Sequence, residues 1–355
     1  MQANPRVALA YKSHSTHNRA SHFGLGVTAL NNAKVLLDNG IRADVWPVAS
    51  AAELRCRLER ALRDGAPITH VVMSAPWIAS ADWQALAAAF GDTHFAVTCH
   101  SNLGFLQADP SAVRLVREGI EIERASWNFH VAGNSDRFCR WVSTTFNAAC
   151  SYLPNLYYVD PRRIPKPSHF DGGTLRIGAF GATRQLKNLV SAAGAAMQLS
   201  SDLRTDVELW VSAGRNEHGD STTSAIREMT CGTPRMKLIE NGWQSWPQFR
   251  ETVRHMHLLL QPSYTETFNV VTADGVAEGV PSVVSDAIDW APQEWKARVD
   301  DVADIARVAR EILGDRRAAL KGWRALVKHN ARALDAWLDY LKPPIRQNWW
   351  TRLFR

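Results

Sequence analysis

Two acidic residues, Glu266 and Asp274, stand eight positions apart and follow an apolar segment at 258–261. The hydrophobic pattern predicts that a helix starts between them, so Glu266 lies on a loop and Asp274 about one turn into the helix. A helix start offers free N–H groups to an anion, and carboxylates accept hydrogen bonds from hydroxyl groups. This arrangement predicts a ligand that carries both phosphates and hydroxyls, such as a nucleotide sugar.

A basic segment follows another predicted strand, at 175–180, and opens the next predicted helix. It begins with Gly181 and contains Arg184 and Lys187. A glycine lets the backbone approach a ligand, and the two cations can neutralise a diphosphate. The alternative interpretation is an ordinary strand-to-helix turn with exposed basic side chains.

Together the two segments resemble the E-x7-E and lysine-containing segments of GT-B glycosyltransferases, particularly the retaining family 4 group. Lys187 falls on the lysine of that family, whereas Ala182 stands where the family has arginine, and Arg184 is the candidate to replace it. In the acidic segment, Asp274 replaces the second glutamate, and two glycines of the family are replaced by Thr267 and Asn269.

The resemblance implies a role for each of these residues. Asp274 is expected to bind the ribose hydroxyls and Glu266 the hydroxyls of the sugar. The backbone N–H groups of Thr267, Phe268 and Asn269 are expected to bind the phosphates. Lys187 and Arg184 are then expected to stabilise the departing diphosphate, which is the main electrostatic task of this chemistry.

Three further positions match the family more loosely. His100 ends the predicted strand at 93–99, so it points into the ligand crevice of an α/β sheet, where the family has a histidine that reaches the donor sugar. Gly24 and Gly26 precede the first long helix and are expected under the donor phosphates, although they lie too far after the strand at 6–11 for a dinucleotide fingerprint. Trp243 is expected against the nucleobase. Structural packing is the alternative role for His100 and Trp243.

Composition limits the class of protein. The chain has 355 residues, of which 46% are hydrophobic and 21% are charged, and this is typical of a globular protein with two domains. Neither a membrane-spanning run nor an N-terminal signal segment is evident, and five scattered cysteines indicate no disulfide framework or zinc site, so we expect a cytoplasmic protein. The sequence has no D-x-D motif, so neither a metal nor another cofactor is expected.

Apolar runs alternate with amphipathic helical segments, which predicts α/β layers with parallel sheets. A proline-rich break at 160–167 divides the chain, and we expect two Rossmann-like domains that face a central cleft. The expected spans are 1–165 on the acceptor side, 166–335 for the nucleotide sugar, and a tail at 336–355. The predicted strands are 6–11, 43–48, 69–74, 93–99, 129–132, 175–180, 207–211, 236–239, 258–261 and 282–285.

Helical segments are also predicted. Between 53 and 63 the helix is expected to carry the ion pairs Glu53–Arg57 and Glu59–Arg63, and residues 301–340 are helical by pattern.

The resemblance implies a retaining glycosyltransferase that moves a hexose-type sugar from a nucleoside diphosphate sugar to a hydroxyl. A glycan or a lipid-linked glycan is the expected acceptor. Hydroxymethylated bases in DNA are an alternative, supported by the net charge of +6, the pI of about 9.2 and the basic loop at 12–22. The aromatic and basic tail either crosses back onto the first domain or contacts the inner membrane face peripherally. A non-catalytic nucleotide-sugar binding module and a sugar-nucleotide epimerase remain as other functions.

Overall fold

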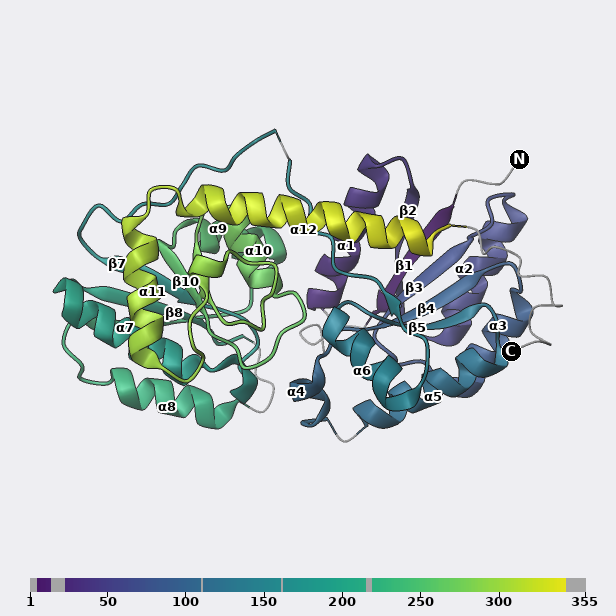
Figure 1. Cartoon of the computed structure of the whole chain (residues 1–355), viewed down its shortest axis with the longest axis horizontal. Helices are drawn as coiled ribbons and strands as arrows, with labels where there is room; N and C mark the ends of the chain where they lie inside the picture. Colours follow the sequence, from purple (N-terminus) through teal and green to yellow (C-terminus); the bar gives the residue numbers. More distant parts are fainter. Residues whose placement is uncertain (1–4, 14–22, 110, 161, 215–218, 343–355) are drawn as a thin grey trace.

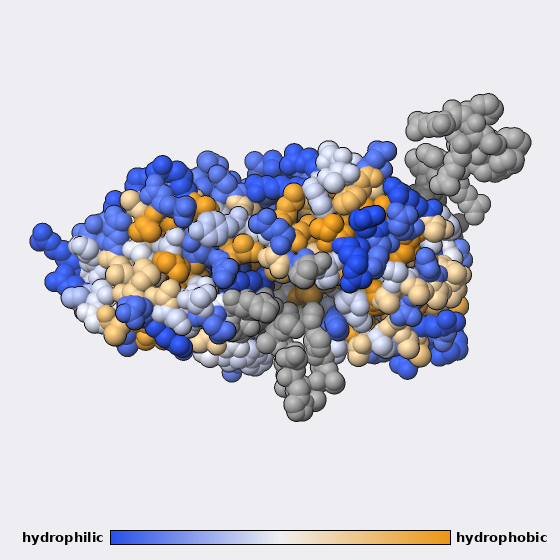
Figure 2. Space-filling view, turned by 90° about the horizontal axis from the view of Figure 1, so that it is seen from below, coloured by the Kyte–Doolittle hydropathy of each residue, from blue (hydrophilic) through white to orange (hydrophobic). Residues whose placement is uncertain are grey.

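The computed structural model describes residues 5–13, 23–109, 111–160, 162–214 and 219–342. Within these ranges, none of the helices has the length and apolar character needed to span a bilayer. The structure has two halves, each built around one sheet, and a long helix runs along both (Figure 1). Seen from below, hydrophobic residues show on both halves, interrupted by hydrophilic ones (Figure 2).

The first half forms a sheet with the strand order β2-β1-β3-β4-β5-β6, and all neighbouring pairs are parallel. Helices follow the strands and cover the sheet, so a central strand such as β3 is buried along its whole length. The strands are β1 (Arg6–Lys12), β2 (Arg42–Val48), β3 (His70–Ser74), β4 (His94–Cys99), β5 (Phe129–Gly133) and β6 (Ser151–Tyr152). The helices are α1 (Phe23–Asp38), α2 (Ala51–Arg63), α3 (Ser80–Ala89), α4 (Leu103–Leu106), α5 (Ala112–Ala125) and α6 (Asp136–Phe146).

The second half forms another parallel sheet, with the order β11-β10-β7-β8-β9. The chain reverses direction across the sheet between β7 and β10, which is the switch point where ligands bind in open α/β sheets. The strands are β7 (Leu175–Ala179), β8 (Val207–Ser212), β9 (Met236–Asn241), β10 (Leu258–Gln261) and β11 (Ser282–Val284). The helices are η1 (Gln185–Lys187), α7 (Leu189–Leu203), α8 (Asp220–Thr230), α9 (Trp246–Arg254), α10 (Val270–Ala277), η2 (Gln293–Trp295), α11 (Val302–Gly314) and α12 (Ala318–Tyr340).

The ten predicted strands are all present, each within two residues of its expected ends. The short strand β6 was not predicted, because two residues carry no alternation. The expected helix at 301–340 is two helices, since the chain breaks at Asp315, whose carboxylate accepts a hydrogen bond from Arg317 N at 2.9 Å. The Glu53–Arg57 ion pair is present at 2.9 Å, but Glu59 pairs with Arg55 rather than with Arg63.

The link between the two halves is held by amide side chains from both sides. On the α1 side, Asn32 Oδ1 accepts from Leu156 N at 2.8 Å and Asn31 Oδ1 accepts from Tyr158 N at 2.9 Å. On the α12 side, Asn330 exchanges two hydrogen bonds with the backbone of Tyr157, at 3.0 and 2.6 Å. The segment just before the proline-rich break at 160–167 is therefore held between α1 and α12 by hydrogen bonds. The sequence predicted only that the chain breaks in this region.

Helix α12 joins the second half to the first (Figure 1). Trp337 is fully buried in the core that contains the β1 residues Val7 and Leu9, and its Nε1 donates to Pro154 O at 2.8 Å. Residues 336–340 of the expected tail belong to α12, whose Trp337 packs in the core of the first half. Residues 343–355, on which a membrane contact was expected, lie outside the described residues.

Three histidines form a stack at the start of neighbouring strands in the first sheet. His70 stacks on His94 with ring centroids 5.2 Å apart, and His94 stacks on His130 at 5.4 Å. Tyr340 of α12 contacts His70 and His130 edge-on, and Glu123 lies 3.6 Å from His130. Burial, followed by the neighbouring His94 and His130, lowers the pKa of His70 to about 3.

This low pKa predicts acid sensitivity of the fold. Below pH 6.5 the unfolded His70 takes up a proton that the folded protein excludes, so stability is lost as the pH falls from 6.5 towards 3. We expect the melting temperature to fall by several degrees between pH 7 and pH 4, and His70→Phe to reduce that fall. The unmodified protein, measured in parallel over the same pH range, provides the reference. Equal slopes for the His70 variant and the unmodified protein would contradict the assignment.

Candidate active site

A cleft of about 550 Å³ lies between the halves, at the carboxyl ends of strands from both sheets. On the second half it is lined by the loops that follow β7 and β10, which flank the switch point of that sheet. The two loops are fastened together, since Tyr264 N donates to Leu186 O at 3.0 Å and Asn188 Nδ2 donates to Pro262 O at 3.1 Å. These bonds bring together two segments that lie almost eighty residues apart in the sequence.

The two segments meet in an ion pair. Lys187 Nζ lies 2.5 Å from Glu266 Oε1, and the two side chains are only 15% and 12% exposed. Asn269 Nδ2 also donates to Glu266 Oε1, at 3.0 Å. The expected catalytic residues Lys187 and Glu266 therefore share one site, in which each charge is compensated by the other.

Helix α10 points its N-terminus into the cleft. Asn269 caps it from the left-handed region at φ 62°, and its side chain accepts from Thr272 N at 2.8 Å. The N–H groups of Val270 and Val271, which also line the cleft, have no acceptor among the described residues. These helix donors therefore lie just after the expected segment Thr267–Asn269, and N–H groups at a helix start are the kind that favour an anion.

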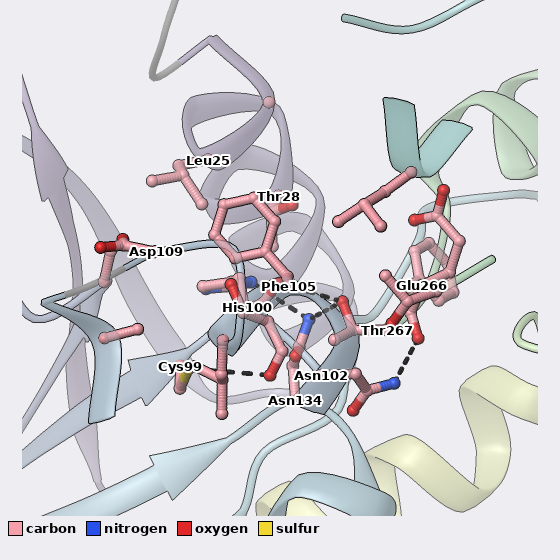
Figure 3. Close-up of a pocket in the computed structure, with 18 of the residues that line it drawn as sticks. Leu25, Thr28, Cys99, His100, Asn102, Phe105, Asp109, Asn134, Glu266 and Thr267 are labelled. Carbon is pink, nitrogen blue, oxygen red and sulfur yellow. Dashed lines mark hydrogen bonds between the residues drawn. The ribbon is translucent and has the colours of Figure 1, made fainter. Parts of the chain in front are cut away.

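The first half contributes a polar group that joins it to this loop. Asn134 Nδ2 lies 3.1 Å from His100 Nδ1 and 3.0 Å from Thr267 Oγ1 (Figure 3). Asn102 donates to the backbone oxygen of Glu266, and Thr267 Oγ1 donates to His100 O at 3.4 Å. The loop that carries Glu266 is thus held by both halves.

His100 lies at the end of β4 and lines the cleft, as the sequence indicated. Burial lowers its pKa to about 4, so the ring is neutral at pH 7. Nε2 is buried and has no hydrogen-bond partner among the described residues.

Asp274, which was expected to bind a ribose, is not among the residues that line the cleft. Its side chain is enclosed, and its Oδ1 accepts from Tyr157 at 2.5 Å and from Trp246 Nε1 at 2.8 Å. Burial raises the pKa of this carboxyl to about 6, although the two donors and Arg250 oppose the increase. The side chains of Tyr157, which precedes the proline-rich break, and of Trp246 in α9 therefore occupy the space beside Asp274.

The other expected positions divide into two groups. Gly24 and Phe268 line the cleft, and Arg184 reaches it with its guanidinium carbon 5.4 Å from the ring centre of Phe105. Gly181 adopts φ 124°, which favours glycine, and a Cβ there would lie 3.4 Å from Lys187 Cε. By contrast, neither Gly26, which faces the ring of Tyr11, nor Trp243, which is 52% exposed, lines the cleft.

Sequence reasoning missed the asparagines Asn102 and Asn134. The available signal was their position, since each follows the end of a buried strand of a parallel sheet. The basic loop expected to bind the acceptor is described only at Lys12 and Ser13, and residues 14–22 lie outside the described residues.

The sequence profile described as "Family 4 Glycosyltransferase in conflict systems" matches residues 149–336, which is more than half of the chain. The protein belongs to this glycosyltransferase family. The matched span contains the whole second sheet and most of α12, including Lys187 and Glu266. No protein with a curated description matches the sequence of this glycosyltransferase.

Solved structures with the same architecture cover nearly the whole glycosyltransferase. Sucrose-phosphate synthase from Thermosynechococcus elongatus aligns with a TM-score of 0.63 and 14% identity, over 95% of this chain and 98% of its own. The trehalose-6-phosphate synthase OtsA aligns with a TM-score of 0.64 and 11% identity, over 95% and 99%. Anabaena HepE, solved with UDP and glucose, gives 0.56 and 12%, over 94% and 99%. At these identities the likeness shows the fold, which is GT-B: two Rossmann-like sheets facing a cleft.

The enclosure of Asp274 predicts different results for two substitutions in this glycosyltransferase. Asp274→Ala leaves the Tyr157 and Trp246 donors unpaired and should destabilise the fold by about 1–3 kcal/mol for each donor. Asp274→Asn keeps an acceptor oxygen and removes the buried charge. Since the folded pKa is raised, the charge costs stability as the pH rises from 3.8 through about 6, so the asparagine variant should match or exceed the unmodified protein at pH 8. Urea unfolding measures both, and equal losses would contradict the burial argument.

Proposed function

We propose that this glycosyltransferase moves a hexose-type sugar from a nucleoside diphosphate sugar to an acceptor hydroxyl, with retention of configuration. The observation that carries the proposal is the meeting of Lys187 and Glu266 beside the free N–H groups of α10. A cation and helix donors suit a diphosphate, and a carboxylate suits sugar hydroxyls. The UDP bound in Anabaena HepE, a protein of the same fold, supports a donor of this class.

In the proposed reaction, the bond between the anomeric carbon and the donor phosphate breaks, and the phosphate oxygen keeps the electron pair. The acceptor oxygen forms its bond to the anomeric carbon on the same face, and its proton passes to the departing phosphate. Lys187, with Arg184 beside it, stabilises the charge on that phosphate. Glu266 and His100, which both line the cleft, orient the hydroxyls of the transferred sugar.

The proposal includes a change in the ion-pair partner of Lys187 when the donor binds. In the free protein Lys187 is paired with Glu266. A diphosphate at the start of α10 offers Lys187 a second anion, and this releases Glu266 oxygens for sugar hydroxyls. Because both side chains are largely shielded from water, the exchange takes place where electrostatic interactions are strong.

Substitutions in the ion pair test the donor site. Lys187→Ala should lower kcat about a hundredfold or more, since it removes a preorganised charge from the leaving phosphate. Glu266→Gln should lower kcat by roughly ten- to a hundredfold, the loss expected for one charged hydrogen bond. The assay incubates the protein with UDP-, GDP- and ADP-sugars and separates hydrolysis, epimerisation and transfer by NMR, which also reports the anomer formed.

A surface ion pair of the same half is the matched control. Lys237 Nζ lies 3.0 Å from Glu208 Oε1, and the lysine side chain is exposed. Lys237→Ala and Glu208→Gln should leave all rates unchanged. If the cleft variants behave like these controls while their folds are intact, the donor site lies elsewhere. An inverted product would refute retention, and an epimer without transfer would refute the transferase assignment.

Independence from a divalent metal is a separate prediction. The sequence has no D-x-D motif, and Lys187 with the α10 N-terminus supplies positive potential at the same place. We expect transfer rates to stay within about twofold in excess EDTA. EDTA would then change only the ionic strength that screens surface charges, and would remove no cation from the phosphates. Loss of activity in EDTA and recovery with manganese would show that a metal is required.

A further inference from the structure

We propose that the acceptor carries an apolar group next to its reactive hydroxyl, and that the first half of the cleft binds this group. The inference rests on the proposed function, because it names the second substrate of the same site. The first-half wall combines the end of β3 with α1, α4 and α5. The side chains that carry the argument are Leu25, Trp77, Phe105, Leu106, Leu115 and Val116.

These side chains lie directly beside the donor loop. Helix α4 packs so closely on that loop that a Cβ on Gly104 would lie 3.0 Å from the Thr265 Cβ. The next residue, Phe105, faces the cleft across from Glu266 (Figure 3). An apolar group against Phe105 is therefore within a short reach of the sugar that Glu266 is proposed to hold.

The wall continues inwards as an apolar crevice. A side pocket of about 30 Å³ shares Leu115 and Val116 with the main cleft and reaches the buried rings of Phe129 and Phe138. Its lining is mainly aliphatic and aromatic. Removing hydrocarbon from water into such a surface is favourable in proportion to the area buried.

Charges on the two walls are unequal. Among the described residues, Asp109 is the charged side chain that the first half contributes to the lining, and its Oδ1 accepts from Ser111 N and Oγ at 2.9 and 2.8 Å. The lining cations Arg184 and Lys187 both come from the second half. A nucleic-acid acceptor needs cations along its phosphates, and the described first-half lining contains none, although Lys12 lies beside Trp77.

Trp77 fits an amphipathic ligand. Its ring lines the cleft, and Lys12 Nζ lies 5.3 Å from the ring centre. Its Nε1 is buried and has no hydrogen-bond partner among the described residues. A tryptophan so placed offers an apolar face to the hydrocarbon part of an alkyl or aryl glycoside.

The test compares acceptors that differ only in apolar length. The assay uses the full-length protein and a nucleotide sugar that it turns over, with methyl, butyl and octyl glucosides as acceptors. The kcat/KM for the acceptor should rise by about two- to fourfold per added methylene until the apolar wall is filled. Phenyl glucoside distinguishes an aromatic group from a chain. A flat series, or a preference for hydroxymethylated duplex DNA over every glycoside, would overturn the proposal.

Matched variants locate the effect on this wall. Leu115→Asn should remove most of the gain from octyl over methyl, whereas Val113→Asn, on the same helix but outside the lining, should not. Phe105→Ala and Leu103→Ala form the corresponding pair on α4. Donor hydrolysis without acceptor should be unchanged by Val113→Asn, which shows that a polar substitution on this helix does not by itself damage the donor site. Equal effects of Leu115→Asn and Val113→Asn would place the apolar site elsewhere.

A direct binding measurement keeps the two proposals distinguishable. If no nucleotide sugar is turned over or bound, the proposed function fails, and octyl against methyl glucoside is then compared by isothermal titration calorimetry. Tighter binding of the octyl compound, lost in Leu115→Asn and kept in Val113→Asn, would support the apolar site. Equal binding of both glucosides would overturn it.

Discussion

In the described residues, each sheet is built from parallel strands, and this constraint determines where chemistry can occur. Helices cover both faces of a parallel sheet, so its strands carry apolar side chains and its polar groups gather where the strands end. His100 and Asn134 follow strands of the first sheet in this way, and Lys187 and Glu266 follow strands of the second. Two such edges facing each other form the cleft.

The ion pair between Lys187 and Glu266 gives the cleft its electrostatic character. Two opposite charges at 2.5 Å, each mostly shielded from water, compensate the cost of burying either alone. Under the proposed function, an anionic ligand meets a paired lysine and exchanges places with its carboxylate. The site is preorganised in position, because Asn269 and the hydrogen bonds between the two loops fix both side chains.

The halves contribute unlike surfaces to one space. The second half supplies charges and helix donors, whereas the first supplies a mainly aliphatic and aromatic wall with a few amides. The amides do not form a separate polar surface, because Asn102 and Asn134 bind the Glu266 loop and thus connect the halves. Helix α12 and the linker segment that it contacts also connect the halves.

The sequence by itself determined the alternation of strands and helices and the two half-chains, because these follow from local hydrophobic periodicity. It also indicated Glu266, Lys187 and His100, because polar side chains after buried strands are a local signal. Only the tertiary structure decided that Lys187 pairs with Glu266 and that Asn134 joins His100 to Thr267, since these contacts span from 34 to 133 residues. It also decided the placement of Asp274. Helical spacing puts that residue on α10, but whether it faces ligand or core depends on Tyr157 and Trp246, which arrive from other elements and take its oxygen.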